Sequence, residues 1–303
     1  MTHPQEDVRR GIMLRLSSAV CFAILAALVK LASAGGIPFI QPMFFRSFFA
    51  TLLIAGYIAV LRDPGLLKTQ RPNAHLFRSA IGGTGMLFVF MGIVALPLDQ
   101  ATAIGFSAPL IATLLSAVFL KEKVGRHRWL ATMIGFLGVL IIIHPDPGTM
   151  ISQGAIYALV GVCFISATAV TIRQIAATES GVTIAFYFMA LSSVALAVAL
   201  PFFWTTPTSW QWLLLAGIGI AGGLVQLTST VALRYAPVST LVPFDYTQLL
   251  WAALVAFILW GDVPGEDTLA GAAIVIASGL YIVHRERKLK LPHPPISRIT
   301  DGG

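Results

Sequence analysis

Three charged side chains lie well inside long apolar stretches of the sequence. They are Lys30, Arg46 and Asp245. If these stretches cross a bilayer, each charge costs about 2.5–3.5 kcal/mol at the membrane centre and is expected to face a partner or a water-filled cavity. An arginine at that depth can hold a carboxylate through two hydrogen bonds, and an aspartate can bind a proton or a cation. These residues are therefore the first candidates for a functional site.

Asp245 is the only carboxylate inside a predicted span, about 10 Å from the nearer end. It follows Pro243, which leaves a backbone carbonyl without its helical hydrogen bond. Irregular backbone is tolerated at membrane depth where protein or a water-filled cavity satisfies it. Asp245 is interpreted either as a proton- or cation-binding group or as part of a structural ion pair or helix-end bond.

Arg46 lies about 12 Å from the start of its span, where it can face a cavity or reach back to the membrane surface. Lys30 lies one turn from the end of its span, so reaching the surface competes with a binding role. Six further side chains offer hydrogen bonds or stacking to a ligand, with plain packing as the alternative for each. They are Phe106, Tyr187, Gln226, Tyr246, Gln248 and Trp251.

The sequence lacks the motifs of common nucleotide-driven and catalytic proteins. It contains neither a G-x-x-x-x-G-K-[ST] phosphate loop nor an H-E-x-x-H zinc motif. Cys21 and Cys163 are the only thiols, and both lie in apolar stretches, which predicts no disulfide framework and no cysteine metal site. We expect no cofactor, no metal and no enzymatic activity. An intramembrane enzyme is the alternative, but its polar groups would have to converge at one membrane face.

Long helices must position these residues. The 303-residue chain is 57% hydrophobic and 11% charged, whereas soluble domains have roughly 25% charged residues. Apolar runs of about 17–25 residues recur along it, each long enough to cross the hydrocarbon. We predict an all-α integral membrane protein with ten transmembrane helices. The predicted spans are 11–33, 38–61, 75–96, 101–120, 129–144, 153–173, 182–204, 210–233, 238–260 and 268–283.

The chain also repeats itself. The tripeptide at 20–22 returns at 162–164, the one at 94–96 returns at 231–233, and the segment 140–144 resembles 280–284. The matches keep their order and their positions within the spans, which indicates two five-helix repeats over 11–144 and 153–284. Because five is odd, the second repeat must enter the membrane inverted. Inverted repeats are typical of transporters that open a midplane site to alternate sides.

Basic residues fall on alternate connections. Since Lys and Arg are retained on the cytoplasmic side, we expect both termini to be cytoplasmic, with 1–10 as the amino-terminal segment and 285–303 as a basic disordered tail. The net charge of +7 is thus explained by topology and does not indicate nucleic-acid binding. The basic residues on this side are Arg9, Arg10, Arg15, Arg62, Lys68, Arg71, Arg78, Lys121, Lys123, Arg126, Arg128, Arg173, Arg234 and those of the tail.

Several local patterns resemble the EamA-type permeases of the drug/metabolite transporter superfamily. They are the segment 109–122 ending the fourth span, Gly261-Asp262 at the equivalent place in the ninth, and the glycines Gly135, Gly138, Gly271 and Gly279. Asp262 replaces the glutamate usual there, and Ala131 stands where glycine is more common. The resemblance covers nearly the whole chain and implies two five-helix EamA domains in a cell membrane.

The resemblance and the repeats together predict a secondary transporter of small organic metabolites, whether amino-acid-like, nucleotide-like or drug-like, working by alternating access. In that role Arg46 and Lys30 would bind the solute and Asp245 would couple its movement to a proton or another ion. The expected partners are the solute, the lipid bilayer and the coupling ion, in a monomer or homodimer. A channel or a non-transporting membrane protein is the remaining alternative.

The orientation is directly testable. An alkaline phosphatase fused after Gly303 should be inactive in bacterial cells, because the enzyme folds only in the periplasm and the carboxyl terminus is expected in the cytoplasm. A fusion in the connection around Asp262 should be active. An active carboxyl-terminal fusion would overturn the predicted orientation.

Overall fold

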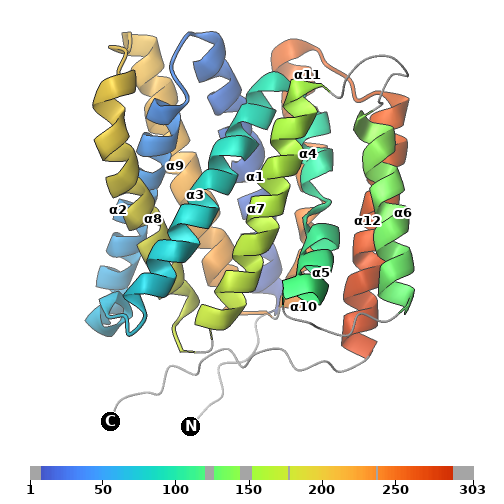
Figure 1. Cartoon of the computed structure of the whole chain (residues 1–303). Coiled ribbons are helices and arrows are strands. Elements are labelled where there is room, and N and C mark those ends of the chain that lie inside the picture. The colour runs from blue at the N-terminus through green and yellow to red at the C-terminus, as the bar shows by residue number, and fades with distance from the viewer. Residues whose placement is uncertain (1–7, 120–125, 144–151, 177, 237, 289–303) are drawn as a thin grey trace.

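The computed structural model describes residues 8–119, 126–143, 152–176, 178–236 and 238–288, and these form a bundle of helices standing side by side (Figure 1). No strand occurs among the described residues. The elements in chain order are α1 (Val8–Ala34), α2 (Ile40–Leu61), the 3-10 helix η1 (Pro64–Leu67), α3 (Pro72–Ala95), α4 (Leu98–Gly105), α5 (Ala108–Phe119), α6 (Arg126–Ile143), α7 (Gln153–Ile175), α8 (Gly181–Ala199), η2 (Leu200–Phe203), α9 (Ser209–Ala232), α10 (Val238–Asp245), α11 (Gln248–Trp260) and α12 (Glu266–Lys288).

These helices follow the ten predicted spans in order. Eight spans are single helices, with η2 extending α8, whereas the fourth is α4 followed by α5 and the ninth is α10 followed by α11. Within the described residues, six helical segments are long and apolar enough to cross a membrane by themselves. The chain is thus an all-α membrane protein, as its hydropathy predicts.

Turn-forming residues end the helices where the sequence predicts. α2 ends at Arg62 with a φ of 54°, and the Asp63 side chain accepts a hydrogen bond of 3.0 Å from the Gly65 N–H. α11 ends at Gly261 with a φ of 73°, a conformation that glycine adopts without strain. The sequence His144-Pro145-Asp146-Pro147-Gly148, which also predicts a turn, lies outside the described residues. The predicted tail begins too early, because α12 continues through Lys288.

The two halves pack against each other through matching pairs of helices. α1 of the first half lies along α9 of the second, and the equivalent helix α7 lies along α3. The halves also meet where α6 lies along α12, two helices that hold the same place in their repeats (Figure 1). A core around Leu25, Phe90 and Leu215 fills the space between α1, α3 and α9. The repeat predicted from the sequence is therefore reflected in the packing.

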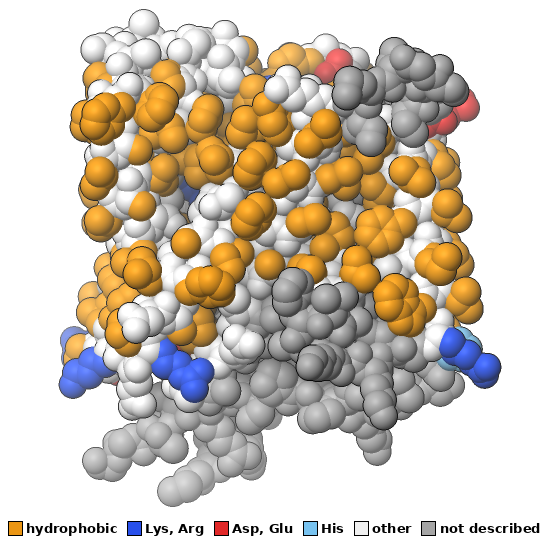
Figure 2. Space-filling model, in the orientation of Figure 1, with side chains coloured by type: hydrophobic (Ala, Val, Ile, Leu, Met, Phe, Trp, Pro, Cys, Tyr) orange, Lys and Arg blue, Asp and Glu red, His pale blue; other side chains and the backbone are white. Residues whose placement is uncertain are grey.

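Charged side chains separate to the two ends of the bundle. We call the end where α1 begins the Val8 side, and the end that holds the α1–α2 connection the Gly36 side. On the face shown in Figure 2, basic side chains gather at the Val8 edge, acidic ones at the Gly36 edge, and apolar side chains cover the zone between. The exposed apolar belt is what a lipid-facing surface requires, because hydrocarbon cannot solvate charge.

The α6–α12 contact allows a test of the packing between the halves. A Cβ added at Gly271 would lie 2.5 Å from the Gly138 carbonyl oxygen, so the two backbones touch without room for a side chain. Gly271→Ala should destabilise the protein by about 1–3 kcal/mol through overpacking and lower the thermal unfolding midpoint. Gly56→Ala is the matched control, because nothing lies within 4 Å of a Cβ there. Equal midpoints for the two variants would contradict this contact.

Candidate functional site

Two crossings are interrupted at equivalent points. α4 gives way to α5 at residues 106–107, and α10 gives way to α11 at 246–247, a shift of 140 residues in both cases (246 − 106 and 247 − 107). At each break a hydroxyl turns back onto the carbonyl oxygen three residues earlier, from Ser107 and from Thr247, both at 2.7 Å. The same two carbonyl oxygens also accept the backbone N–H groups of Ser107 at 3.0 Å and Thr247 at 3.2 Å, so the backbone stays hydrogen-bonded at each break. The duplicated chain thus places two irregular segments inside the bundle.

A cavity of about 500 Å³ lies beside these breaks. Its walls come from both halves, and its volume is in the range of small-molecule sites, about 300–1,000 Å³. Phe106 and Tyr246, which are equivalent in the two repeats, meet edge to face with ring centroids 5.1 Å apart and form part of the wall. Most of the wall is apolar. The polar groups on it include Thr102, Ser166 and Gln248.

An ion pair stands at the edge of this cavity. Arg15 on α1 donates from Nη2 to Asp245 Oδ2 at 2.6 Å, and its Nε donates to Oδ1. This two-bond fork is the strong geometry for a guanidinium and a carboxylate. From the sequence, Arg15 is interpreted only as one of the basic residues that set the orientation in the membrane. In the structure Arg15 lies at about the same depth as Asp245. The positive charge of Arg15 lies against the carboxylate and compensates its negative charge inside the bundle.

The structure brings together four of the nine residues that the sequence proposes for the site. Phe106, Asp245, Tyr246 and Gln248 line the cavity. Gln226 and Trp251 are not on its wall. Gln226 makes a long hydrogen bond of 3.5 Å to Thr230 along α9, and the buried Trp251 Nε1 has no hydrogen-bond partner among the described residues.

Lys30, Arg46 and Tyr187 also lie away from the cavity wall. Lys30 sits at the Gly36 side, where its Nζ donates to the Leu96 carbonyl oxygen at 2.8 Å. Arg46 is buried between α2, α3 and α9. Tyr187 lies near the Val8 side and donates to the Leu67 carbonyl oxygen at 2.8 Å. The position along a helix predicted their depth, but the rotation of each helix decided which way they face.

The comparison with known proteins identifies this architecture. Residues 9–144 and 152–284 each match the sequence pattern of the EamA-like transporter family. The chain belongs to the EamA-like transporter family. Each matched segment contains five of the ten crossings, so the two EamA domains coincide with the two halves that meet at the cavity.

Similar EamA-like proteins carry different small molecules. The chain is 29% identical over 245 residues to an S-adenosylmethionine uptake transporter of Rickettsia bellii, which covers 81% of this chain and 84% of that protein. It is 30% identical over 275 residues to a pseudopaline exporter of Pseudomonas aeruginosa, with coverage of 89% and 95%. It is 29% identical over 288 residues to a riboflavin transporter of Vibrio cholerae, with coverage of 92% and 94%.

The fold is shared with a solved crystal structure that is described only as that of a protein. The TM-score is 0.65 at 16% sequence identity, over 93% of this chain and 99% of the other. Together with the family, the relatives show that this EamA-like protein is a multi-pass membrane protein and a secondary transporter of small metabolites. It is not an enzyme, and the alternatives of an intramembrane enzyme, a channel and a non-transporting protein are set aside.

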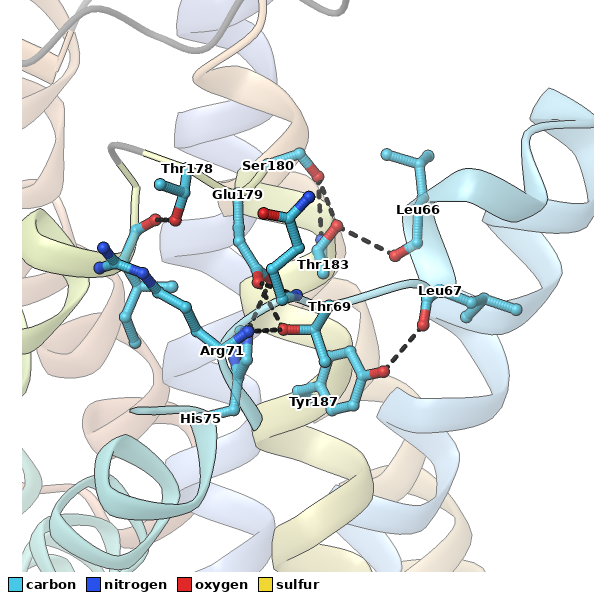
Figure 3. A network of polar contacts seen from close by, with 12 residues as sticks. Leu66, Leu67, Thr69, Arg71, His75, Thr178, Glu179, Ser180, Thr183 and Tyr187 are labelled. Carbon is cyan, nitrogen blue, oxygen red and sulfur yellow. Dashed lines mark hydrogen bonds and ion pairs between the residues drawn. The ribbon is translucent and has the colours of Figure 1, made fainter. Parts of the chain in front are cut away.

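A second polar cluster ties the two EamA domains together at the Val8 side (Figure 3). Glu179, in the α7–α8 connection, accepts hydrogen bonds from His75 Nε2 at 2.7 Å, from the Gln70 N–H at 3.0 Å and from the Thr69 hydroxyl. Nearby, Thr183 of the second domain donates to the Leu66 carbonyl oxygen of the first at 2.9 Å. We call the bonds to Glu179 the Glu179 latch. Because they join both domains, they must break if the domains separate here.

The latch is not predicted from the sequence. Glu179 and His75 are both buried. Glu179 lies in the short α7–α8 connection and His75 lies near the start of α3, and at such places a charged residue predicts only a solvated loop. A carboxylate shortly before a helix that begins at Gly181 was the available signal. Its partners are more than 100 residues away, and no local pattern joins them.

The latch changes the acid strength of Glu179. Burial by itself raises the pKa of a carboxyl group, but the hydrogen bonds from Thr69, His75 and the Gln70 N–H outweigh it, so the pKa of Glu179 lies below its ordinary value of 4.5. A lowered pKa means that the charged form stabilises the fold above that ordinary value. The stabilisation is lost as the pH falls through the lowered pKa.

Glu179→Gln should therefore lower the thermal unfolding midpoint at pH 7, because it removes the charge-assisted bonds. The difference from the wild type should shrink as the pH falls below the ordinary carboxyl value of 4.5 and through the lowered pKa of Glu179, because the carboxylate then becomes protonated. Glu266→Gln is the control, since Glu266 is exposed at the Gly36 side. A Glu179→Gln difference that is constant with pH would contradict the charged latch.

Proposed function

We propose that the transported solute binds in the 500 Å³ cavity and that the Arg15–Asp245 pair couples its movement to a proton. The observation that supports this most is the placement of the pair. Asp245 lies at the end of the interrupted α10, on the wall of a cavity shared by both EamA domains. In secondary transporters, solute and coupling-ion sites typically lie at such broken helices near the repeat interface.

Alternating access is supported by a difference between two equivalent contacts. α2 and α8 are the second helices of the two repeats, and α3 and α9 are the third. α2 packs closely along α9, whereas the equivalent contact of α8 with α3 is much looser. A duplicated molecule in one fixed shape would make the two contacts alike. If the halves exchange these two arrangements, the loose contact tightens and the tight one opens, and the cavity is exposed to the other side of the membrane.

The Arg15–Asp245 pair provides a chemical basis for coupling. In the structure the guanidinium makes two hydrogen bonds to the Asp245 carboxyl group, a contact that favours its charged form. If the rearrangement draws α1 away from α10, the carboxylate loses its countercharge inside the bundle and gains affinity for a proton. Protonation would then neutralise the separated pair and permit the return step. Solute exchange without a proton is the competing reading, in which the pair serves only as a gate.

The orientation proposed here places the Val8 side, with the Glu179 latch, in the cytoplasm. Basic residues such as Arg62 and Arg71 lie on that side, and Asp99, Asp262 and Glu266 lie on the other. Retention of basic residues in the cytoplasm gives this direction. The latch would accordingly be a cytoplasmic contact.

The coupling proposal predicts separate behaviour of two transport assays. S-adenosylmethionine and riboflavin, the solutes named for two relatives, serve as first probes in proteoliposomes, followed by solutes that accumulate or disappear in cells lacking the protein. Asp245→Asn should abolish uptake driven by an imposed pH gradient and retain counterflow, because exchange needs binding but no proton. Asp262→Asn is the matched control at the exposed Gly36 side and should keep both.

Removing Asp245 alone leaves the partly buried Arg15 without its countercharge, which by itself can destabilise the fold. The double variant Arg15→Gln/Asp245→Asn removes both charges and controls for this instability. Wild-type uptake that ignores the pH gradient, with counterflow intact, would overturn the proton proposal and favour exchange. Loss of both activities in the double variant would indicate that the pair is needed for binding.

A further inference from the structure

Two arginines are buried deep in the bundle and have no role in the cavity wall. Arg46 on α2 is 6% exposed and Arg78 on α3 is 5% exposed. Each lies six residues inside its helix, about 9 Å from the helix start. Arg78 was expected near a helix end, but α3 begins at Pro72, which carries Arg78 to membrane depth.

Neither guanidinium is satisfied. Arg46 Nε and Arg78 Nε and Nη1 are buried without a hydrogen-bond partner, and no described carboxylate pairs with either residue. Each guanidinium instead lies near the face of an aromatic ring. The Arg46 guanidinium lies 6.0 Å from the centre of the Phe90 ring, and that of Arg78 lies 3.9 Å from the centre of the Phe188 ring. An aromatic ring attracts a cation much more weakly than an anion does.

The two arginines are also close enough for their like charges to repel each other. Among the buried acids, Asp245 is bound by Arg15 and Glu179 by the latch, and Asp99, in the first turn of α4, pairs with neither arginine. Two neighbouring positive charges in a low dielectric, with donors aimed at no acceptor, are strongly unfavourable. The countercharge is therefore expected from outside the described chain.

Further unsatisfied polar groups lie on α3 and on α8, the helix that Arg78 packs against. Ser79 Oγ on α3 and Ser192 Oγ on α8 are buried without partners. A Cβ at Gly83 would lie 4.0 Å from Ser192 Oγ, which shows that α3 and α8 face each other here across a small residue. The two hydroxyls are thus further buried donors without an acceptor at the contact between the domains.

The arginines bridge the two EamA domains. Arg46 packs on Gly222 of α9, where a Cβ would lie 2.4 Å from Arg46 Cγ, and Arg78 packs on Phe188 of α8. Arg78 occupies the same face of α3 as Met86 and Val89, which line the cavity at helical spacing. A group held by both arginines would therefore lie at the domain interface, next to the cavity.

We infer that Arg46 and Arg78 form a binding site for an oxyanion, a carboxylate or phosphate group on the transported solute. Arginine suits this role because its planar fork binds such a group through two hydrogen bonds and stays charged. A bound oxyanion also cancels the repulsion between the two guanidiniums. The functional reading rests on transport through the adjacent cavity, whereas the binding itself can be measured without transport.

The test uses the purified full-length protein and its thermal unfolding midpoint. Sodium acetate and sodium phosphate are titrated at constant ionic strength against sodium chloride, with uncharged acetamide as the analogue of acetate. A ligand that binds only the folded state raises the midpoint. We expect acetate or phosphate to raise it and acetamide to have no effect. Arg46→Gln and Arg78→Gln should each weaken the oxyanion response at least tenfold, and the exposed control Arg9→Gln should leave it unchanged.

Stability without anion provides a second readout. Arg78→Gln removes one of two repelling buried charges and should raise the midpoint in the absence of oxyanion, by about 2 °C or more, whereas a purely structural arginine would lower it on removal. The variants Arg46→Lys and Arg78→Lys keep the charge without the fork and should give a weaker response than the wild type. If a glutamine variant fails to fold, the two lysine variants still test the site.

The same titrations distinguish the sources of the anion. A stronger response to acetate assigns a carboxylated solute, and a stronger response to phosphate assigns a phosphoryl group. A response that follows chloride, or one that is equal in the wild type and both arginine variants, would overturn the site. Failure here leaves the Asp245 coupling assays unaffected, and loss of pH coupling in those assays leaves the arginine site standing.

Discussion

Charge inside a low-dielectric bundle is the constraint on which the rest of the structure depends. A charge at membrane depth is tolerated only when a partner, a cavity or a ligand compensates it. Asp245 has Arg15, Glu179 has the hydrogen bonds of the latch, and Lys30 reaches a carbonyl oxygen at the Gly36 side. Arg46 and Arg78 have no such partner among the described residues, and they lie where the two domains meet. In the proposed function, the positions of these charges mark the parts of the molecule that act in transport.

Duplication supplies the geometry in which these charges can work. The breaks at 106–107 and 246–247 are equivalent, and the ring of Phe106 meets that of its counterpart Tyr246 at the cavity. The charged residues do not follow this symmetry. Asp245 has no acidic counterpart, since residue 105 is glycine, and the two buried arginines both belong to the first domain. A symmetric scaffold that can rearrange therefore carries an asymmetric set of chemical groups.

The two ends of the domain interface are held by different forces. At the Val8 side, Glu179 joins the domains through a few directional bonds that weaken when the carboxylate is protonated. Along α6 and α12 the domains touch through backbone, at Gly138 and Gly271, with no polar side chain needed. Directional bonds can open and close at modest cost, whereas a close-packed backbone contact resists separation.

The sequence alone determined the membrane-spanning class, the order of the helices, the repeat and the depth of Asp245, because apolar run length, collinear matches and helical rise are local quantities. It also indicated Phe106, Tyr246 and Gln248 near the break. Only the tertiary structure decided the partners. Arg15 lies 230 residues from Asp245, and His75 lies 104 residues from Glu179. Which helix faces meet depends on the rotation and tilt of the packed helices, and contacts across the whole bundle set both. For this reason the two pairs have no local signature in the sequence. The same holds for the placement of Arg46 and Arg78 at the contact between the domains.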